Sequence, residues 1–175
     1  SDGKAAALPT NAFLSADRRK VPQIAFLFPG QGSQYPDMVR EVSLYFNEMR
    51  QAVEHADRCL QGRLPEPLHR LIYPPAAFAE DEAEGQALRL SDTRVAQPAL
   101  AAVEAGLLDL TARLGLRPDR LAGHSCGEYA ALHAGGALSR AAFYDLVAVR
   151  GAVMAEACRA TSGATGAGRR SILLS

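Results

Sequence analysis

The stretch LAGHSCGEYA, residues 121–130, places a serine between two glycines, after a short apolar run and before a helical one. This Gly-x-Ser-x-Gly pattern is typical of a nucleophile elbow, a tight strand-to-helix turn that carries the serine. Gly123 and Gly127 suit such a turn because a side chain at either position would collide with the neighbouring strand or helix. Ser125 would then sit at a helix N-terminus, where free backbone N–H groups can stabilise an oxyanion.

With 15 glycines in 175 residues, such a pattern can also arise by chance. The prediction of an elbow therefore depends on whether a strand precedes the serine and a helix follows it. Residues 23–30 are a continuous apolar run closed by Pro29 and Gly30, as expected of a buried parallel strand, and RLAGHS at 120–125 predicts a second strand. Residues 63–92, rich in proline, indicate short turns and helices at the surface. Longer helices are expected over 48–61 with Asn47 as N-cap, over 97–115 with Pro98 at the first helical position, over 127–134, and from a Ser139 cap to about Ala160.

This alternation of strands and helices predicts an α/β fold: a parallel sheet with helices on both faces and a nucleophile elbow. The apolar content of 48% and charged content of 22% are those of one globular domain. Nineteen basic and nineteen acidic residues leave no net field to recruit nucleic acid or an anionic membrane, and no apolar run approaches the ~20 residues that span a bilayer. Three widely spaced cysteines without metal-ligand spacing favour a reduced, cytoplasmic protein without a metal.

A serine hydroxyl needs a base to become a nucleophile, and none of the four histidines fits that task. His124 is adjacent to Ser125 and points away from it on a sharp turn. His133 lies two helical turns further on, about 12 Å along the axis. His55 and His69 have polar neighbours and are expected in solvent. The sequence therefore predicts a nucleophile without its general base.

Four motifs stand in a fixed order along the chain: FPGQGSQ at 28–34, AQPAL at 96–100, GHSCGEYAAL at 123–132 and VRGAVM at 149–154. Together they resemble the acyltransferase domain of polyketide synthases and its relative, malonyl-CoA:acyl carrier protein transacylase. The resemblance covers residues 21–162 and implies the N-terminal part of such a domain, its α/β-hydrolase-like large subdomain. Residues 1–20 would be a linker or domain edge, and residues 163–175 a divergent tail or truncation. The ferredoxin-like small subdomain and the general-base histidine, which come later in the family, would be absent.

The resemblance implies a role for each matched residue around the elbow. Ser125 would accept the acyl group from coenzyme A, and the backbone N–H groups of Gln31 and Cys126 would form the oxyanion hole. A phosphate loop is the alternative for the GQGSQ segment, but Tyr35 stands where the third glycine of G-x-G-x-x-G should be. His124 would support the site.

Arg150 and Gln97 would bind substrate. The resemblance assigns Arg150 to the free carboxylate of a malonyl-type unit, a bidentate task that suits a guanidinium, and Gln97 to the lining of the site. The alternative for Arg150 is a surface arginine on an ordinary helix. The segment VAVRGAVM is apolar on both sides of it, and a charge buried there would need a partner.

The implied reaction moves a malonyl-type unit from coenzyme A to the phosphopantetheine thiol of an acyl carrier protein, through an acyl-serine and without a tightly bound cofactor. Malonyl is favoured over methylmalonyl by the stretch TRVAQPAL and by Cys126, where methylmalonyl enzymes often have glutamine. Malonyl-CoA, the carrier protein and other domains of a synthase would be its partners. Without the histidine this chain is expected to be inactive alone. Two alternatives stay open: a serine hydrolase or thioesterase, and a non-catalytic truncated module.

Overall fold

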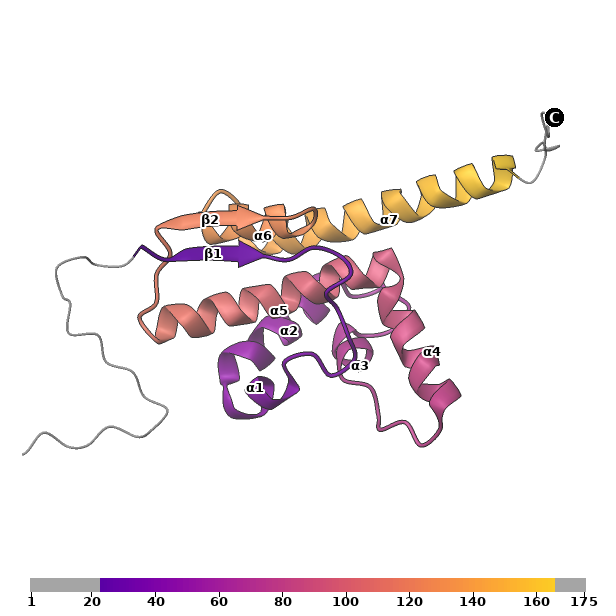
Figure 1. Ribbon diagram of the computed structural model, residues 1–175, viewed down its shortest axis with the longest axis horizontal. Helices are drawn as coiled ribbons and strands as arrows, with labels where there is room; N and C mark the ends of the chain where they lie inside the picture. The colour runs from indigo at the N-terminus through magenta and orange to yellow at the C-terminus, as the bar shows by residue number, and fades with distance from the viewer. Residues whose placement is uncertain (1–22, 166–175) are drawn as a thin grey trace, which may run out of the picture.

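The computed structural model describes residues 23–165 of the chain, in which a small parallel sheet lies along one side of a group of helices (Figure 1). The predicted linker at residues 1–20 and the last ten residues of the predicted tail lie outside this range. No helix within it is long and apolar enough to cross a membrane. The elements are β1 (Ala25–Phe28), α1 (Arg40–Tyr45), α2 (Asn47–Cys59), α3 (Leu68–Ile72), α4 (Glu80–Ser91), α5 (Thr93–Arg113), β2 (Arg120–Gly123), α6 (Gly127–Ala134) and α7 (Arg140–Thr165).

The sheet joins the two segments that carry the motifs around Ser125. β1 and β2 pair in parallel, with Ala25 opposite Arg120 and Phe28 opposite Gly123, so both strands end at the same edge. α6, which follows β2, contacts both strands. This arrangement confirms the predicted α/β class with its elbow, and the described residues contain no ferredoxin-like subdomain.

One expectation about β1 is wrong. A continuous apolar run predicted a buried strand, yet Leu27 is 76% exposed while its neighbour Phe28 is buried. The reason is that successive side chains of a strand point to opposite faces of the sheet: the face that carries Phe28 is covered, whereas no described element covers the face that carries Leu27.

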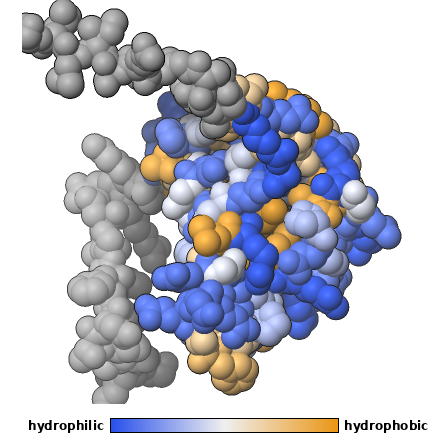
Figure 2. Space-filling view, turned by 90° about the vertical axis from the view of Figure 1, so that its right-hand side faces the viewer, coloured by the Kyte–Doolittle hydropathy of each residue, from blue (hydrophilic) through white to orange (hydrophobic). Residues whose placement is uncertain are grey.

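The core lies where α5 packs against both α2 and α7 (Figure 1). Close approach of α2 requires Gly106 on α5, because a Cβ there would lie 2.8 Å from the sulfur of Met49. On the other side, the buried Tyr144 of α7 donates its hydroxyl to the carbonyl of Ala52 at 3.2 Å. Figure 2 shows the end of the molecule at the right of Figure 1, which is mostly hydrophilic with separate apolar patches.

The boundaries of α5 and α2 differ from those expected. α5 begins at Thr93, four residues before the predicted start, because the side chain of Asp92 caps it by accepting the N–H of Arg94 at 2.9 Å. Pro98 is therefore an interior residue, whose missing N–H deprives the carbonyl of Arg94 of its usual helical donor. Asn47, the expected N-cap of α2, is instead its first residue.

The last helix bears out its predicted cap. The hydroxyl of Ser139 accepts the N–H of Ala142 at 3.2 Å, as an N-cap does. α7 then continues to Thr165, five residues beyond the expected end near Ala160.

Candidate active site

Ser125 stands on the turn between β2 and α6 with a φ of 56°, in the left-handed region. A non-glycine residue held there costs about 1–3 kcal/mol and persists only when its surroundings impose it. The surroundings are the two glycines: a Cβ on Gly123 would collide with the carbonyl of Gly127, and a Cβ on Gly127 would collide with the carbonyls of Phe28 and Pro29. The backbone geometry of a nucleophile elbow is therefore present.

The loop after β1 lies directly against this turn. A Cβ on Gly30 would fall 2.6 Å from the carbonyl oxygen of His124 and 3.1 Å from the Cβ of Ser125, so only glycine allows the approach. The N–H of His124 donates to the carbonyl of Phe28 at 3.0 Å, which holds the ends of the two strands together. His124 is exposed, its Nδ1 lies 3.0 Å from where a Cβ on Gly30 would stand, and its supporting role stays a prediction.

The backbone N–H groups of Gln31 and Cys126, the predicted oxyanion donors, lie near one another. Within residues 23–165 neither donates to a backbone carbonyl. Burial raises the pKa of the Cys126 thiol, and the nearby Glu104 carboxyl raises it further, whereas the Gln31 N–H and the Arg150 charge lower it. The Gln31 N–H therefore lies near the Cys126 thiol, and the convergence of both amides on a substrate oxygen stays a prediction.

Arg150, on α7, is half-buried and reaches the serine. Its two terminal nitrogens donate to different partners: Nη1 to Oε1 of Gln97 at 2.8 Å and Nη2 to the Ser125 hydroxyl oxygen at 3.2 Å. Among the described residues Arg150 has no carboxylate partner. The half-buried guanidinium thus places a positive charge at the serine, whereas its role toward a substrate stays a prediction.

A chain of hydrogen bonds continues from Gln97, which is fully buried on α5. Its Nε2 donates to the hydroxyl of Thr93 at 2.9 Å, and that hydroxyl donates to Oε1 of Gln31 at 2.7 Å. The Gln97 amide also lies 3.4 Å from the sulfur of Met154. The predicted residues Gln31, Gln97, Ser125 and Arg150 therefore form one connected group.

Sequence reasoning missed Thr93. The signal was available, because Thr93 and Gln97 are four residues apart and share a face when both are helical. An expected helix start at Gln97 leaves Thr93 outside the helix, so the face that the two residues share does not emerge from the sequence.

None of the histidines with described side chains hydrogen-bonds to the Ser125 hydroxyl. His133 contacts the carbonyl of Leu138 through Nδ1 at 2.9 Å, well away from the elbow. His55, expected in solvent, is half-buried edge-on against Tyr144, and burial lowers its pKa. Among the described residues the geometry supplies a strained serine and a cation, and no imidazole that hydrogen-bonds to the serine hydroxyl.

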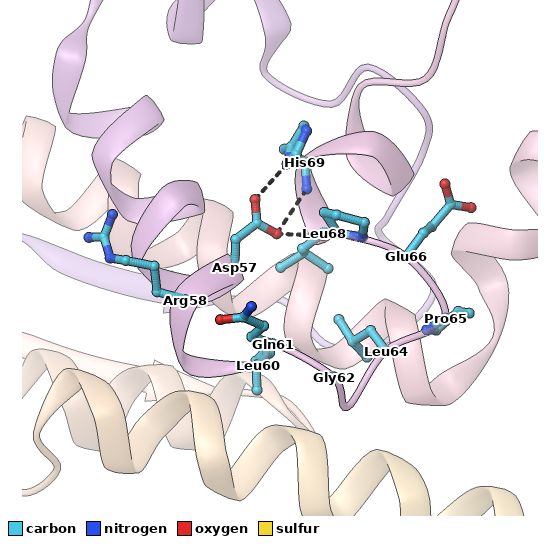
Figure 3. A pocket seen from close by; sticks show the side chains of 11 residues that line it. Asp57, Arg58, Leu60, Gln61, Gly62, Leu64, Pro65, Glu66, Leu68 and His69 are labelled. Atoms are coloured by element: carbon cyan, nitrogen blue, oxygen red, sulfur yellow. Dashed lines mark hydrogen bonds and ion pairs between the residues drawn. The ribbon is translucent and has the colours of Figure 1, made fainter.

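A pocket of about 440 Å³ lies elsewhere, where α2 leads into α3 (Figure 3). Its one aspartate, Asp57, accepts the backbone N–H of Leu68 at 2.5 Å and contacts Nδ1 of His69 at 2.6 Å. The carboxylate is thereby used to hold the start of α3. No group of three or more His, Cys, Asp or Glu that could hold a metal ion occurs among the described residues.

The fold and the site together define an α/β protein with a nucleophile elbow, in which a cation and a glycine loop converge on the serine. The family follows from comparison: the model of the acyl transferase domain matches residues 25–170, and the chain belongs to that family.

Individual relatives agree. The malonyl CoA-acyl carrier protein transacylase of Bacillus subtilis (strain 168) is 39% identical over 145 residues, covering 83% of this chain and 41% of that protein. Spectinabilin polyketide synthase system protein NorB of Streptomyces orinoci is 38% identical over 131 residues, covering 75% of this chain and 6% of that protein.

Among solved structures, the acyl-carrier-protein-S-malonyltransferase of Bartonella henselae superposes with a TM-score of 0.65 at 36% identity, covering 76% of this chain and 39% of that one. The chain thus spans about two fifths of the length of the single-domain relatives it matches.

Proposed function

We propose that this chain supplies the nucleophile part of an acyl transferase site, which moves a malonyl-type unit from coenzyme A to the phosphopantetheine thiol of an acyl carrier protein. The observation that carries the proposal is the Arg150 guanidinium, which lies 3.2 Å from the Ser125 hydroxyl without a carboxylate partner of its own among the described residues. A cation beside a strained serine suits an acyl group that itself bears a carboxylate.

The first half-reaction forms the acyl-serine. The oxygen of Ser125 attacks the thioester carbonyl carbon, its proton passes to a base, and the carbonyl oxygen becomes an oxyanion received by the N–H groups of Gln31 and Cys126. The C–S bond then breaks, the coenzyme A sulfur takes a proton, and the malonyl group remains as an ester on the serine. No step needs a metal or a tightly bound cofactor.

The second half-reaction reverses the first with a new thiol. The pantetheine sulfur of the carrier protein attacks the ester carbonyl after losing its proton to the base, and the ester C–O bond breaks to return the Ser125 hydroxyl. Throughout, Arg150 would hold the malonyl carboxylate by two parallel hydrogen bonds, with Gln97 keeping the guanidinium in place at 2.8 Å.

The base is the part that the described residues do not supply, since none of their histidines meets Ser125. We infer that it comes from outside them, and that the chain acting alone acylates slowly, because loss of one triad member typically costs several orders of magnitude in rate. The names of the relatives support malonyl as the unit and an acyl carrier protein as the acceptor, with other synthase domains as further partners. Cys59 and Cys126 both remain thiols, which fits a cytoplasmic setting.

Intact-mass spectrometry after brief incubation with malonyl-CoA tests the proposal. The chain alone is compared with a fusion that adds the C-terminal part of the Bacillus subtilis relative, each with a Ser125→Ala control. We expect a malonyl adduct that forms rapidly on the fusion, slowly or not at all on the chain, and on neither Ser125→Ala variant. A fusion that is folded but unacylated would contradict the proposal.

The same samples separate the alternatives. A serine hydrolase would release free malonate faster than it transfers malonyl to an added holo carrier protein, whereas a transferase would do the opposite. A non-catalytic module would behave identically with Ser125 and with alanine at that position.

A further inference from the structure

We propose that Thr93 is a positioning residue of this site. Its hydroxyl holds the loop of residues 30–34, which contains Gln31, in a fixed position against the elbow. The proposal rests on the function above and deepens it, because it names what keeps the predicted oxyanion donor of Gln31 in place. Thr93 belongs to none of the four sequence motifs.

The hydroxyl of Thr93 is a bridge between two amide side chains. It accepts a hydrogen bond from Nε2 of Gln97 at 2.9 Å and donates one to Oε1 of Gln31 at 2.7 Å. The direct distance between the two glutamine side chains is 3.5 Å, at the limit for a hydrogen bond. The bridge therefore provides most of the connection between α5 and the side chain of Gln31.

Two other hydrogen bonds of residues 30–34 stay within the loop. The hydroxyl of Ser33 donates to the carbonyl of Gly30 at 2.9 Å, and the N–H of Gly32 donates to Oε1 of Gln34 at 2.8 Å. Such bonds shape the loop without fixing where it lies against the rest of the molecule. Gly30 contacts the elbow, and the Gln31 side chain is the tether that fixes the loop on the side facing α5.

Thr93 is itself held from two directions. It is the first residue of α5, directly after the capping Asp92. Its carbonyl lies against α7 at Gly151, where a Cβ would come within 2.6 Å of the carbonyl oxygen. The Arg150 guanidinium is connected to Thr93 through Gln97, which bonds to both. A threonine fixed at a junction of two helices is well suited to fix a third segment.

The chemical consequence follows from the geometry of oxyanion stabilisation. Donors act only when they lie about 2.7–3.1 Å from the developing charge, and loss of one donor costs about 10²–10³ in rate. Loosening the tether would displace that donor for part of the time without removing the malonyl-binding cation. We therefore expect a defect in the acylation step more than in binding.

Two substitutions isolate the hydroxyl. Thr93→Val keeps the shape and removes the bridge, whereas Thr93→Ser keeps the bridge. Single-turnover acylation of the fusion by malonyl-CoA gives the maximal rate and the apparent Kd from one concentration series. We expect Thr93→Val to lower the maximal rate by about 10- to 100-fold with the Kd within about 3-fold, and Thr93→Ser to stay within about 3-fold in both. A wild-type rate in Thr93→Val, or equal loss in both variants, would overturn the assignment.

Hydrogen exchange of the backbone amides of residues 30–34 tests the same idea without any chemistry. We expect exchange there to rise about 10-fold in Thr93→Val, to stay unchanged in Thr93→Ser, and to stay unchanged in α2 in both. Thr111→Val is the matched control, because that hydroxyl on the same helix donates only to the carbonyl of Leu108 at 2.9 Å.

Failure of the two proposals is thereby distinguishable. An unacylated wild type would sink the proposed function, and the exchange data would still decide the role of Thr93. Unchanged loop exchange in Thr93→Val would overturn the tether even if acylation proceeds.

Discussion

Arg150 donates a hydrogen bond to the hydroxyl oxygen of Ser125 across 3.2 Å, although 25 residues separate them in the chain. A guanidinium cannot remove the proton of that hydroxyl, because it carries no lone pair available as a base. Its place beside the serine fits a substrate that brings its own negative charge. The contact also connects the elbow to α7.

Replacing Arg150 should change the selectivity for the acyl group more than it changes the stability of the fold. Loss of a buried charge partner costs about 2–5 kcal/mol, so Arg150→Ala should lower malonyl transfer by at least about 30-fold while leaving acetyl transfer within a few-fold. Arg150→Lys should fall between, because ammonium keeps the charge and loses the bidentate geometry. The measurement is the ratio of acylation rates from malonyl-CoA and acetyl-CoA in the fusion protein. Equal losses with both thioesters would argue against carboxylate recognition.

Gly127→Ala should destabilise the protein severely, because its Cβ would be driven into the carbonyls of Phe28 and Pro29. Backbone atoms cannot move aside cheaply, so a loss of at least about 3 kcal/mol is expected. Gly85→Ala is the matched control: nothing lies within 4 Å of its added Cβ, and it stands inside α4. That change should stabilise the helix by up to about 1 kcal/mol. Thermal unfolding of the two variants should thus shift Tm in opposite directions.

Because of Glu104, the free energy of unfolding should fall as the pH rises. Burial raises its pKa to about 8, and its Oε1 has no hydrogen-bond partner in the described structure. Between the unfolded value near 4.5 and about 8, the unfolded chain gives up a proton that the folded protein keeps, so the free energy of unfolding decreases with pH, by at most about 1.4 kcal/mol per unit. Below that window the contribution is fully present.

Glu104→Gln checks this reasoning, since a neutral amide does not titrate. The difference in stability between variant and wild type, measured by urea unfolding, should favour the variant increasingly from pH 5 to pH 8. The exposed Glu84→Gln should show no such trend. A pH-independent difference at Glu104 would mean that the carboxyl is not buried as described.

Asp57→Ala should weaken the fold without touching the chemistry. It removes the acceptor of the Leu68 N–H and the contact with His69 (Figure 3), at an expected cost of about 1–2 kcal/mol, as for other lost caps. Acylation of Ser125 per folded molecule should stay unchanged. A fall in the acylation rate at full folding would instead connect this pocket to the site.

The elbow and its loop could be predicted from the sequence because glycine spacing encodes them directly. Gly123, Gly127 and Gly30 stand where any side chain would collide with backbone, so local pattern and tertiary structure impose the same residues. Gln97 and Arg150 came from motif resemblance, and the structure brings Arg150 to the serine and Gln97 to Arg150.

Thr93 and Leu27 could not be placed in the same way. Pro98 usually marks a helix start, but the Asp92 cap and the packing of α7 at Gly151 outweigh that preference and extend α5 to Thr93. The sequence predicts Leu27 to be a core residue because an apolar side chain in a strand indicates a surface that is suited to burial. Which elements cover each face of the sheet is a property of the whole domain, which a local pattern does not contain.

The pairing of Phe28 with Gly123 has a consequence for how this protein must fold. The loop begins directly after Phe28 and the elbow directly after Gly123. The alignment of the two strands therefore sets the distance between the loop and the elbow. A slip by one residue would displace one against the other by about 3.3 Å, far more than an oxyanion site tolerates. Correct pairing of β1 with β2 would therefore be a condition for activity in any acyl transferase assembled around this chain, since a shifted pairing would leave the loop and the elbow apart.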